Sequence, residues 1–135
     1  MTVGELTDAD VEDVVALWQQ VGLTRPWNDP VTDFRRALLG PTSRVLGVRV
    51  DGQLVGTVMV GHDGHRGWVY YLAVRQEHQR RGVGATLMNA AEGWLRRSGA
   101  VKSQLMVRRE NEGALRFYDC VGYKVSDVTV LARWL

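Results

Sequence analysis

The chain has 135 residues, of which 45% are hydrophobic and 24% are charged. This length and composition are typical of one globular domain, so we expect a single domain over residues 1–135. No apolar run approaches the roughly 20 residues of a membrane span, and the first residues lack the basic-then-apolar pattern of a secretory signal. We therefore expect a cytoplasmic protein with no membrane partner. A single cysteine, Cys120, excludes an internal disulfide.

Charge is unevenly divided along the chain, although the formal net charge is only +2. Residues 1–67 carry six Lys and Arg against nine Asp and Glu, whereas residues 68–135 carry eleven against six. A cationic second half favours a polyanionic ligand. Nucleic acid is one such ligand, but we find no basic strip with interleaved aromatic residues and no nucleic-acid motif. We therefore expect no nucleic-acid partner.

The first half of the chain predicts two helices and a strand meander. A short strand over residues 1–6 precedes a helix that ends near Gly22, because apolar residues recur at helical spacing up to Trp18. Asp29 and Pro30 have the residue types of a helix cap and a first helical position, so they predict the start of a second helix.

Three strands are predicted next. Two β-rich runs, residues 44–50 and 54–60, flank Asp51-Gly52, which is a strong hairpin signal. The third strand covers residues 68–74. Alternation along a strand implies that its three aromatic residues cannot all share a face, so at least one of them is expected to line a cleft; they are Trp68, Tyr70 and Tyr71.

The turn after the third strand is the most informative segment. Its sequence is Gln79-Arg80-Arg81-Gly82-Val83-Gly84, and a helical pattern begins right after it. Such a turn presents backbone N–H groups to an anion, and the helix N-terminus adds roughly half a positive charge. Gly82 and Gly84 allow close approach, while Arg80 and Arg81 add donors that suit phosphate. The alternative is an ordinary strand-to-helix connection with exposed arginines, because this spacing is not a Walker loop.

The remaining elements complete an α+β or mixed α/β pattern with helices on both faces of a sheet. A strand is predicted over residues 105–108, and one or two strands over residues 123–134. Between them, Asn111 caps a helix with one apolar stripe that includes Tyr118. Cys120, on the same helix, is expected to be a small core residue rather than a nucleophile.

A metal site is a weaker interpretation of the turn that contains His62 and His65. Only one carboxylate, Asp63, lies between them in a predicted turn, so a hairpin loop is favoured and no metal is expected.

Two segments resemble motifs of the GCN5-related N-acetyltransferase (GNAT) family. Residues 79–84, set between a strand and a helix, resemble its coenzyme A-binding signature Q/R-x-x-G-x-G/A. Residues 111–123 resemble its downstream pattern N-x-x-A-x-x-F-Y-x-x-x-G-[FY]. The two motifs stand in the family's order, and the resemblance covers almost the whole chain. Residues 23–30 and 67–74 further resemble the small single-domain YpeA-like subgroup.

The resemblance implies a GNAT-like acyl-CoA acyltransferase fold, with a central, mostly antiparallel, splayed sheet of about six to seven strands flanked by about four helices. It implies an enzyme that moves an acetyl group from acetyl-CoA to a primary amine of a small molecule or of a protein or peptide N-terminus. The transfer would be direct, within a ternary complex. Final strands in this fold often pair between subunits, so the resemblance allows a homodimer, while the sequence itself does not set the oligomeric state. The alternative is a non-catalytic acyl-CoA-binding or regulatory module with the same fold.

The resemblance also implies roles for individual residues. The backbone of residues 72–74 would pair with the pantetheine arm, and the N–H groups of residues 80–85 would hold the pyrophosphate. The full predicted cofactor set is Leu72, Ala73, Val74, Gln79, Arg80, Arg81, Gly82, Val83, Gly84, Ala85 and Asn111. Tyr118 matches the family's proton donor to the departing thiolate. The predicted acceptor contacts are Trp27, Asn28, Asp29 and Tyr70.

No general base is evident at the positions where relatives often carry glutamate, because these hold Trp68 and Met106. The alternatives are a water relay, a loop residue or an acceptor that needs little help. The loop candidates are Asp29, Asp63, His65 and Glu110. We favour an acceptor amine of low pKa, because an α-amino group has a pKa near ~8 and a lysine side chain near ~10.4.

Overall fold

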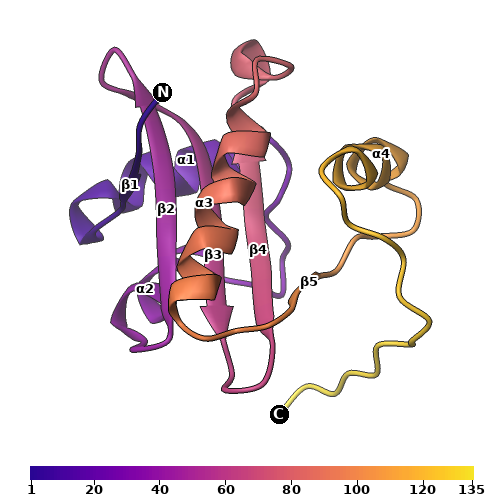
Figure 1. The fold of residues 1–135 in the computed structure, drawn as a ribbon. Helices are drawn as coiled ribbons and strands as arrows, with labels where there is room; N and C mark the ends of the chain where they lie inside the picture. The colour runs from indigo at the N-terminus through magenta and orange to yellow at the C-terminus, as the bar shows by residue number, and fades with distance from the viewer. The chain divides into compact units, whose positions relative to one another are not determined.

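The computed structural model describes residues 1–135 as two compact units, residues 1–105 and residues 106–135, which are described separately. The first unit is a five-stranded sheet in the order β1-β2-β3-β4-β5, with three α-helices (Figure 1). Strands β1 to β4 pair antiparallel, and β5 pairs parallel to β4. The mostly antiparallel sheet predicted from the sequence is confirmed.

The elements of the first unit follow one another with short connections. In chain order they are β1 (Val3–Glu5), α1 (Val11–Gln20), α2 (Pro30–Leu39), β2 (Ser43–Val50), β3 (Gln53–His62), β4 (Gly67–Val74), α3 (Val83–Arg97) and β5 (Ser103–Leu105), with short 3-10 turns at Asp8–Asp10 and Gln76–His78.

Local sequence signals explain most of these boundaries. Asp29 caps α2, since its Oδ1 accepts a hydrogen bond from the Val31 N–H at 3.0 Å, and Pro30 takes the first helical position. Asp51 and Gly52 both have positive φ, 50° and 80°, as a two-residue hairpin turn requires. Gly22, with φ of 75°, ends α1 as predicted.

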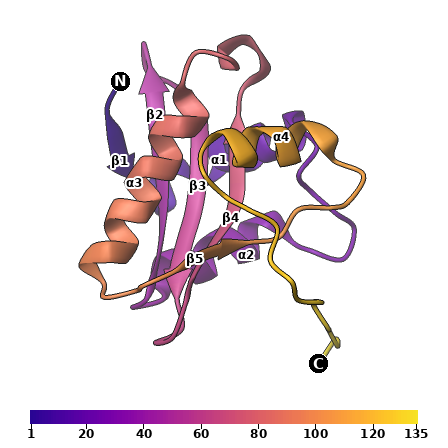
Figure 2. The ribbon, with the colours of Figure 1, turned by 45° about the vertical axis from the view of Figure 1, so that its right-hand side comes forward.

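The helices cover both faces of the sheet (Figures 1 and 2). Helices α1 and α2 pack on one face, around a buried cluster that includes Trp18 and Phe34, whose rings meet edge to face at 6.2 Å. Helix α3 packs on the other face. It lies close to the strands because two glycines face it: a Cβ on Gly56 would lie 2.8 Å from Leu87 Cδ1, and one on Gly67 would lie 2.6 Å from Leu95 Cδ1.

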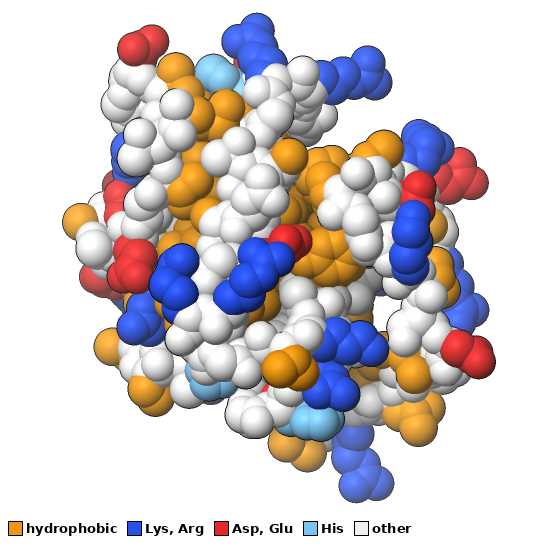
Figure 3. Space-filling model, viewed as in Figure 1, with side chains coloured by type: hydrophobic (Ala, Val, Ile, Leu, Met, Phe, Trp, Pro, Cys, Tyr) orange, Lys and Arg blue, Asp and Glu red, His pale blue; other side chains and the backbone are white.

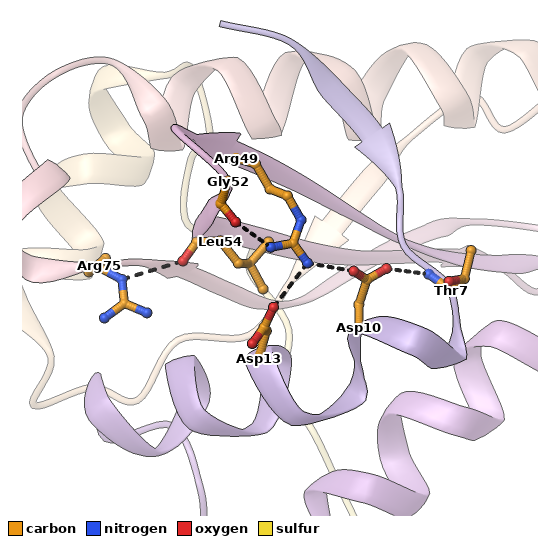
Figure 4. A network of polar contacts seen from close by, with 7 residues as sticks. All are labelled: Thr7, Asp10, Asp13, Arg49, Gly52, Leu54 and Arg75. Carbon is orange, nitrogen blue, oxygen red and sulfur yellow. Dashed lines mark hydrogen bonds and ion pairs between the residues drawn. The ribbon is translucent and has the colours of Figure 1, made fainter.

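An ion-pair network ties the β2–β3 hairpin to the start of α1 (Figure 4). Arg49 donates to Asp10 Oδ1 at 2.5 Å, to Asp13 Oδ2 at 3.1 Å and to the Gly52 carbonyl at 2.9 Å. Burial raises the pKa of Asp10, but the Thr7 N–H and Arg49 outweigh it, so the pKa is lowered. The network therefore holds the hairpin against α1 with Asp10 ionised.

The second unit contains one helix, α4 (Glu112–Cys120). Asn111 caps it as predicted, because its Oδ1 accepts from the Ala114 N–H at 3.1 Å, and Gly122 with φ of 98° follows its end. No helix in either unit is both long and apolar enough to cross a membrane.

The predicted number of strands, six to seven, is wrong, because the sheet has five. Strand β5 covers Ser103–Leu105 rather than residues 105–108, and residues 123–134 form no strand. A β-rich run becomes a strand only where a neighbouring strand and a packed face are available. Val125 and Leu131 are about nine-tenths exposed, at 92% and 90%, so these apolar residues have neither.

The close approach of α3 to the sheet leads to a stability prediction. We expect Gly56→Ala to destabilise the protein by about 1–3 kcal/mol, because the new methyl group would overlap Val83 and Leu87, both buried. Gly4→Ala is the matched control, since a Cβ there meets nothing within 4 Å. Urea unfolding of both variants checks this, and equal stabilities would contradict tight packing at Gly56.

Candidate functional site

The predicted pantetheine-binding residues lie on an edge of β4 that no strand covers. Strand β5 pairs with β4 only at Gly67, Trp68 and Val69. On its other side β4 stays paired with β3 as far as Val74, which lies opposite Gly56. The backbone from residue 70 to residue 74 therefore has no strand partner on the β5 side, and at its end the Val74 carbonyl accepts from the Gln79 side chain. An extended ligand that carries amides can satisfy the backbone groups of such an edge as an added strand.

A β-bulge interrupts β4 at the start of this free edge. Thr57 lies opposite Ala73 and Met59 lies opposite Tyr70, so Tyr71 and Leu72 together face the single residue Val58. Tyr71 has φ of 51°, in the left-handed region that glycine adopts more easily. Holding a tyrosine there costs about 1–3 kcal/mol, which other contacts must offset.

The bulge overturns the expectation that the three aromatic residues of β4 divide between the two faces. Tyr70 lies opposite Met59, which packs against the α1–α2 cluster, and Tyr71 stacks on Trp18 of that cluster at 3.8 Å. Trp68 stands two residues before Tyr70, and their rings stack at 6.5 Å. All three therefore lie on the α1–α2 face, because the extra residue in the bulge breaks the alternation.

A chain of hydrogen bonds surrounds Tyr71. The Trp18 indole N–H donates to Thr57 Oγ1 at 2.9 Å, and the Thr57 hydroxyl donates to the Tyr71 carbonyl at 3.1 Å. The Tyr71 hydroxyl donates to Asp33 Oδ2 at 2.6 Å. Burial, with the Asp33 carboxylate beside it, raises the pKa of Tyr71, so its phenol stays a neutral donor.

The sequence analysis did not predict the residues of this hydrogen-bond chain. One signal could have found it: Thr57 is the only hydroxyl residue between Leu54 and Val60, a run of otherwise apolar residues on a buried strand. A buried hydroxyl needs hydrogen-bond partners, and these come from elements distant in the sequence.

The turn from β4 to α3 has the backbone shape expected of an anion site. Arg80 has φ of 63°, and Gly82 has φ of 82° and serves as the N-cap of α3. The helix begins at Val83, not after Gly84 as predicted, because Gly82 in the left-handed conformation starts it two residues earlier.

Several donors gather at this turn. The first intrahelical bond of α3 runs from the Thr86 N–H to the Gly82 carbonyl at 3.0 Å, so the N–H groups of residues 83–85 have no helical acceptor. Arg80 and Arg81 are exposed, and basic side chains project at the top of the space-filling view, where the turn lies (Figure 3). Gln79 instead donates to the Val74 carbonyl at 3.1 Å, which joins the turn to the end of β4.

The predicted acceptor contacts lie partly before α2 and partly on β4. Trp27 is 55% exposed, and Tyr70 is 43% exposed on the α1–α2 face of the sheet. The N–H of Asn28 donates to the Arg25 carbonyl at 3.1 Å, which turns the loop. Asp29 accepts from the Thr32 hydroxyl at 2.9 Å, in addition to capping the helix.

Two of the loop carboxylates proposed as general bases are occupied by local hydrogen bonds. Asp63 Oδ1 accepts from the N–H groups of Arg66 and His65, at 2.7 and 2.8 Å, which lower the pKa of Asp63. The bonds from Thr32 and the helix N–H groups likewise lower the pKa of Asp29. A carboxylate with a lowered pKa accepts a proton less readily, so neither Asp63 nor Asp29 gains basicity here.

The other predicted residues belong to the second unit. Tyr118 contacts Phe117 and Tyr123 ring to ring, at 5.1 and 6.0 Å, and burial raises the pKa of Tyr118 to about 12. Its phenol is therefore protonated at neutral pH. Cys120 is exposed, so the expectation of a core cysteine is wrong. Because Cys120 is two positions after Tyr118 on the helix, the two side chains point in different directions.

The first unit thus contains the β4 edge, the β4–α3 turn and the residues around Tyr70, whereas the second unit contains Asn111, the N-cap of α4, and Tyr118, within α4. No group of three or more His, Cys, Asp and Glu side chains is arranged to hold a metal ion. The roles of all these residues stay predictions.

Comparison with known proteins gives a consistent result. The model of the acetyltransferase (GNAT) family matches residues 9–123. A similar solved structure is AAC(6')-Iy with the bisubstrate analog CoA-S-monomethyl-acetylneamine, at 15% identity and a TM-score of 0.85, over 99% of this chain and 97% of that chain.

Two further structures share the fold. Aminoglycoside 6'-N-acetyltransferase AAC(6')-IG from Acinetobacter haemolyticus has 14% identity and a TM-score of 0.83, over 100% of this chain and 99% of that chain. Ribosomal-protein-alanine N-acetyltransferase from Brucella melitensis biovar Abortus 2308 has 19% identity and a TM-score of 0.78, over 99% of this chain and 100% of that chain. Identities this low show a shared fold alone, and the predicted fold class is confirmed.

The β4–α3 turn gives a prediction with a matched control. Gly82→Ala and Gly99→Ala each add a methyl group at positive φ in open space, at opposite ends of α3, so each should cost about 1–2 kcal/mol of stability. We expect only Gly82→Ala to weaken coenzyme A binding, by roughly tenfold, because it distorts the N–H groups of the turn. Calorimetric titration with coenzyme A checks this, and equal affinities of the two variants would contradict an anion site there.

Proposed function

Because the chain belongs to the acetyltransferase (GNAT) family, we propose that it transfers the acetyl group of acetyl-CoA to a primary amine. The predicted family, the acyltransferase class and acetyl-CoA as cosubstrate are confirmed at the level of the family. The acceptor would be a small molecule or the N-terminus of a protein or peptide. Transfer would be direct, within a ternary complex.

The observation that carries this proposal is the continuity of two donor surfaces within the first unit. The uncovered edge of β4 at residues 70–74 is joined through the 3-10 turn Gln76–His78 to residues 79–82 and the N-terminus of α3. Coenzyme A has amides in its pantetheine arm and negative charge in its pyrophosphate, so its two chemistries match the two surfaces in order.

Two kinds of amine acceptor are named for proteins with this fold. The 6'-N-acetyltransferases act on aminoglycosides, and the Brucella enzyme is named for the alanine of a ribosomal protein. Both are consistent with a primary amine as the group that this chain would acetylate. The exposed aromatic residues Trp27 and Tyr70, with Asn28 and Asp29, would contact such an acceptor.

Each residue in the proposal has a defined task in the transfer. The amine nitrogen bonds to the carbonyl carbon and the carbon–sulfur bond breaks. The one proton that the amine loses passes to water, which returns a proton to Tyr118 after Tyr118 has protonated the thiolate. A backbone N–H near residues 72–74 would stabilise the negative charge that develops on the carbonyl oxygen. Tyr118 would donate its proton to the departing thiolate, for which its protonated state at neutral pH is suited. Cys120 is poorly placed to carry the acyl group, since its side chain turns away from Tyr118.

A second candidate function is a non-catalytic acyl-CoA-binding module. One observation favours it: Trp68 and Met106 occupy the positions where relatives often carry glutamate, and Asp29 and Asp63 have lowered pKa values. The retained Tyr118 favours catalysis.

Several expectations stay predictions from the sequence. They are the YpeA-like subgroup, a single domain over residues 1–135, a homodimer, a cytoplasmic location and the lack of a nucleic-acid partner.

The lowered pKa values of Asp29 and Asp63 lead to a prediction about the acceptor. We expect thiol release from acetyl-CoA at neutral pH to be faster with peptide α-amino groups or other amines of low pKa than with lysine side chains. An α-amino group, with a pKa near ~8, is partly neutral there, and a lysine amine near ~10.4 is almost wholly charged. A thiol-release assay over a panel of amines checks this. Equal or faster turnover on lysine side chains would contradict it, and binding without turnover on any amine would favour the module.

The proton-donor role of Tyr118 is tested by removing its hydroxyl. We expect Tyr118→Phe to lower thiol release roughly tenfold or more while acetyl-CoA still binds, because the thiolate would leave unprotonated. Tyr123→Phe is the matched control, since it alters a neighbouring tyrosine and keeps the ring that contacts Tyr118. An equal loss of thiol release in both variants would indicate an effect on packing and would contradict the proton-donor role of Tyr118.

A further inference from the structure

We propose that Thr57 and Tyr71 are positioning residues: the hydrogen-bond chain from Trp18 through Thr57 to the Tyr71 carbonyl aims the Leu72 N–H at the acyl carbonyl of the donor. This inference rests on the proposed function. The residues concerned lie outside the two motifs of the family. The buried hydroxyl of Thr57 takes no part in the transfer itself, and the inference assigns it a positioning role.

The chain of hydrogen bonds has only one possible direction. The Trp18 indole can donate but cannot accept, so Thr57 Oγ1 must accept its proton, at 2.9 Å. The single hydroxyl proton of Thr57 is then left for the Tyr71 carbonyl at 3.1 Å. Trp18 and Thr57 are both 0% exposed, so no water competes for these bonds. The Tyr71 carbonyl is therefore held toward β3.

The position of that carbonyl decides where the next N–H points. The chain has no cis peptide bond, and in a trans peptide the C=O and N–H point in opposite directions. Since the Tyr71 carbonyl points toward Thr57 on β3, the Leu72 N–H points away from β3. That side is the edge of β4 that β5 leaves uncovered beyond Val69.

The side chain of Tyr71 also fixes the position of this peptide group. Its ring stacks on Trp18 with an angle of 11° between the planes, and its hydroxyl donates to Asp33 Oδ2 at 2.6 Å. A tyrosine does not adopt φ of 51° by preference, so these contacts select the bulged conformation. Trp18 thus contacts Tyr71 directly by its ring and indirectly through Thr57.

A spectroscopic test follows that needs no amine acceptor. Acetyl-CoA labelled with carbon-13 at the carbonyl is bound to the protein, and its carbonyl stretch is read by isotope-edited infrared difference spectroscopy. A hydrogen bond from the Leu72 N–H lowers this frequency relative to free acetyl-CoA. We expect Thr57→Val, which keeps the shape and loses the hydroxyl, to lose most of the downshift. Thr57→Ser, which keeps the hydroxyl, is the matched control and should retain it.

Two controls accompany each variant: thermal melting checks that it is folded, and calorimetric titration checks that it binds acetyl-CoA. A downshift that persists in loaded Thr57→Val would overturn the proposal. Should Thr57→Val fail to fold, Tyr71→Phe decides: it keeps the stacked ring and loses the bond to Asp33, and we expect a smaller downshift, whereas an unchanged one would overturn the proposal. If the unaltered protein does not bind acetyl-CoA, the proposed function fails, and the inference fails with it.

Discussion

The left-handed conformation of Tyr71 is the constraint on which the candidate site depends. One extra residue in β4 breaks its register with β3, and β4 emerges with an edge that β5 does not follow. Such an edge is a liability in most sheets, because its free N–H and C=O groups invite other strands. Here it lies where the acyl donor of the family is expected, so under the proposed function the bulge would make an unpaired edge available to that donor.

The other parts of the first unit keep that edge in place. Gly56 and Gly67 allow α3 to approach the sheet closely, so the N-terminus of α3 follows the end of β4 after one short turn. Gln79 fastens this turn to the Val74 carbonyl. The opposite face is anchored by the cluster around Trp18, which reaches Tyr71 both through its ring and through Thr57. The bulge is thus held between two packed layers.

The two positions where relatives often carry a glutamate hold no proton acceptor in this chain. Trp68 and Met106 cannot accept a proton, and the carboxylates of Asp29 and Asp63 are engaged by backbone N–H groups. The alternatives that remain are His65, Glu110, a water relay and an acceptor that needs little help, and we favour the last. Under this proposal the enzyme would select among amines by their pKa as well as by the contacts proposed for the acceptor.

The sequence by itself determined the features that depend on neighbouring residues. The cap at Asp29, the hairpin at Asp51-Gly52, the cap at Asn111 and the family motifs could all be predicted, because each is decided within a few positions of the chain. Only the tertiary structure decided the bulge, the number of strands and the shared face of Trp68, Tyr70 and Tyr71. These depend on partners far along the chain: Trp18 and Thr57 are 39 residues apart, and Asp33 and Tyr71 are 38 residues apart. Pairing and packing over such separations leave no local pattern, so residue types alone could not reveal them.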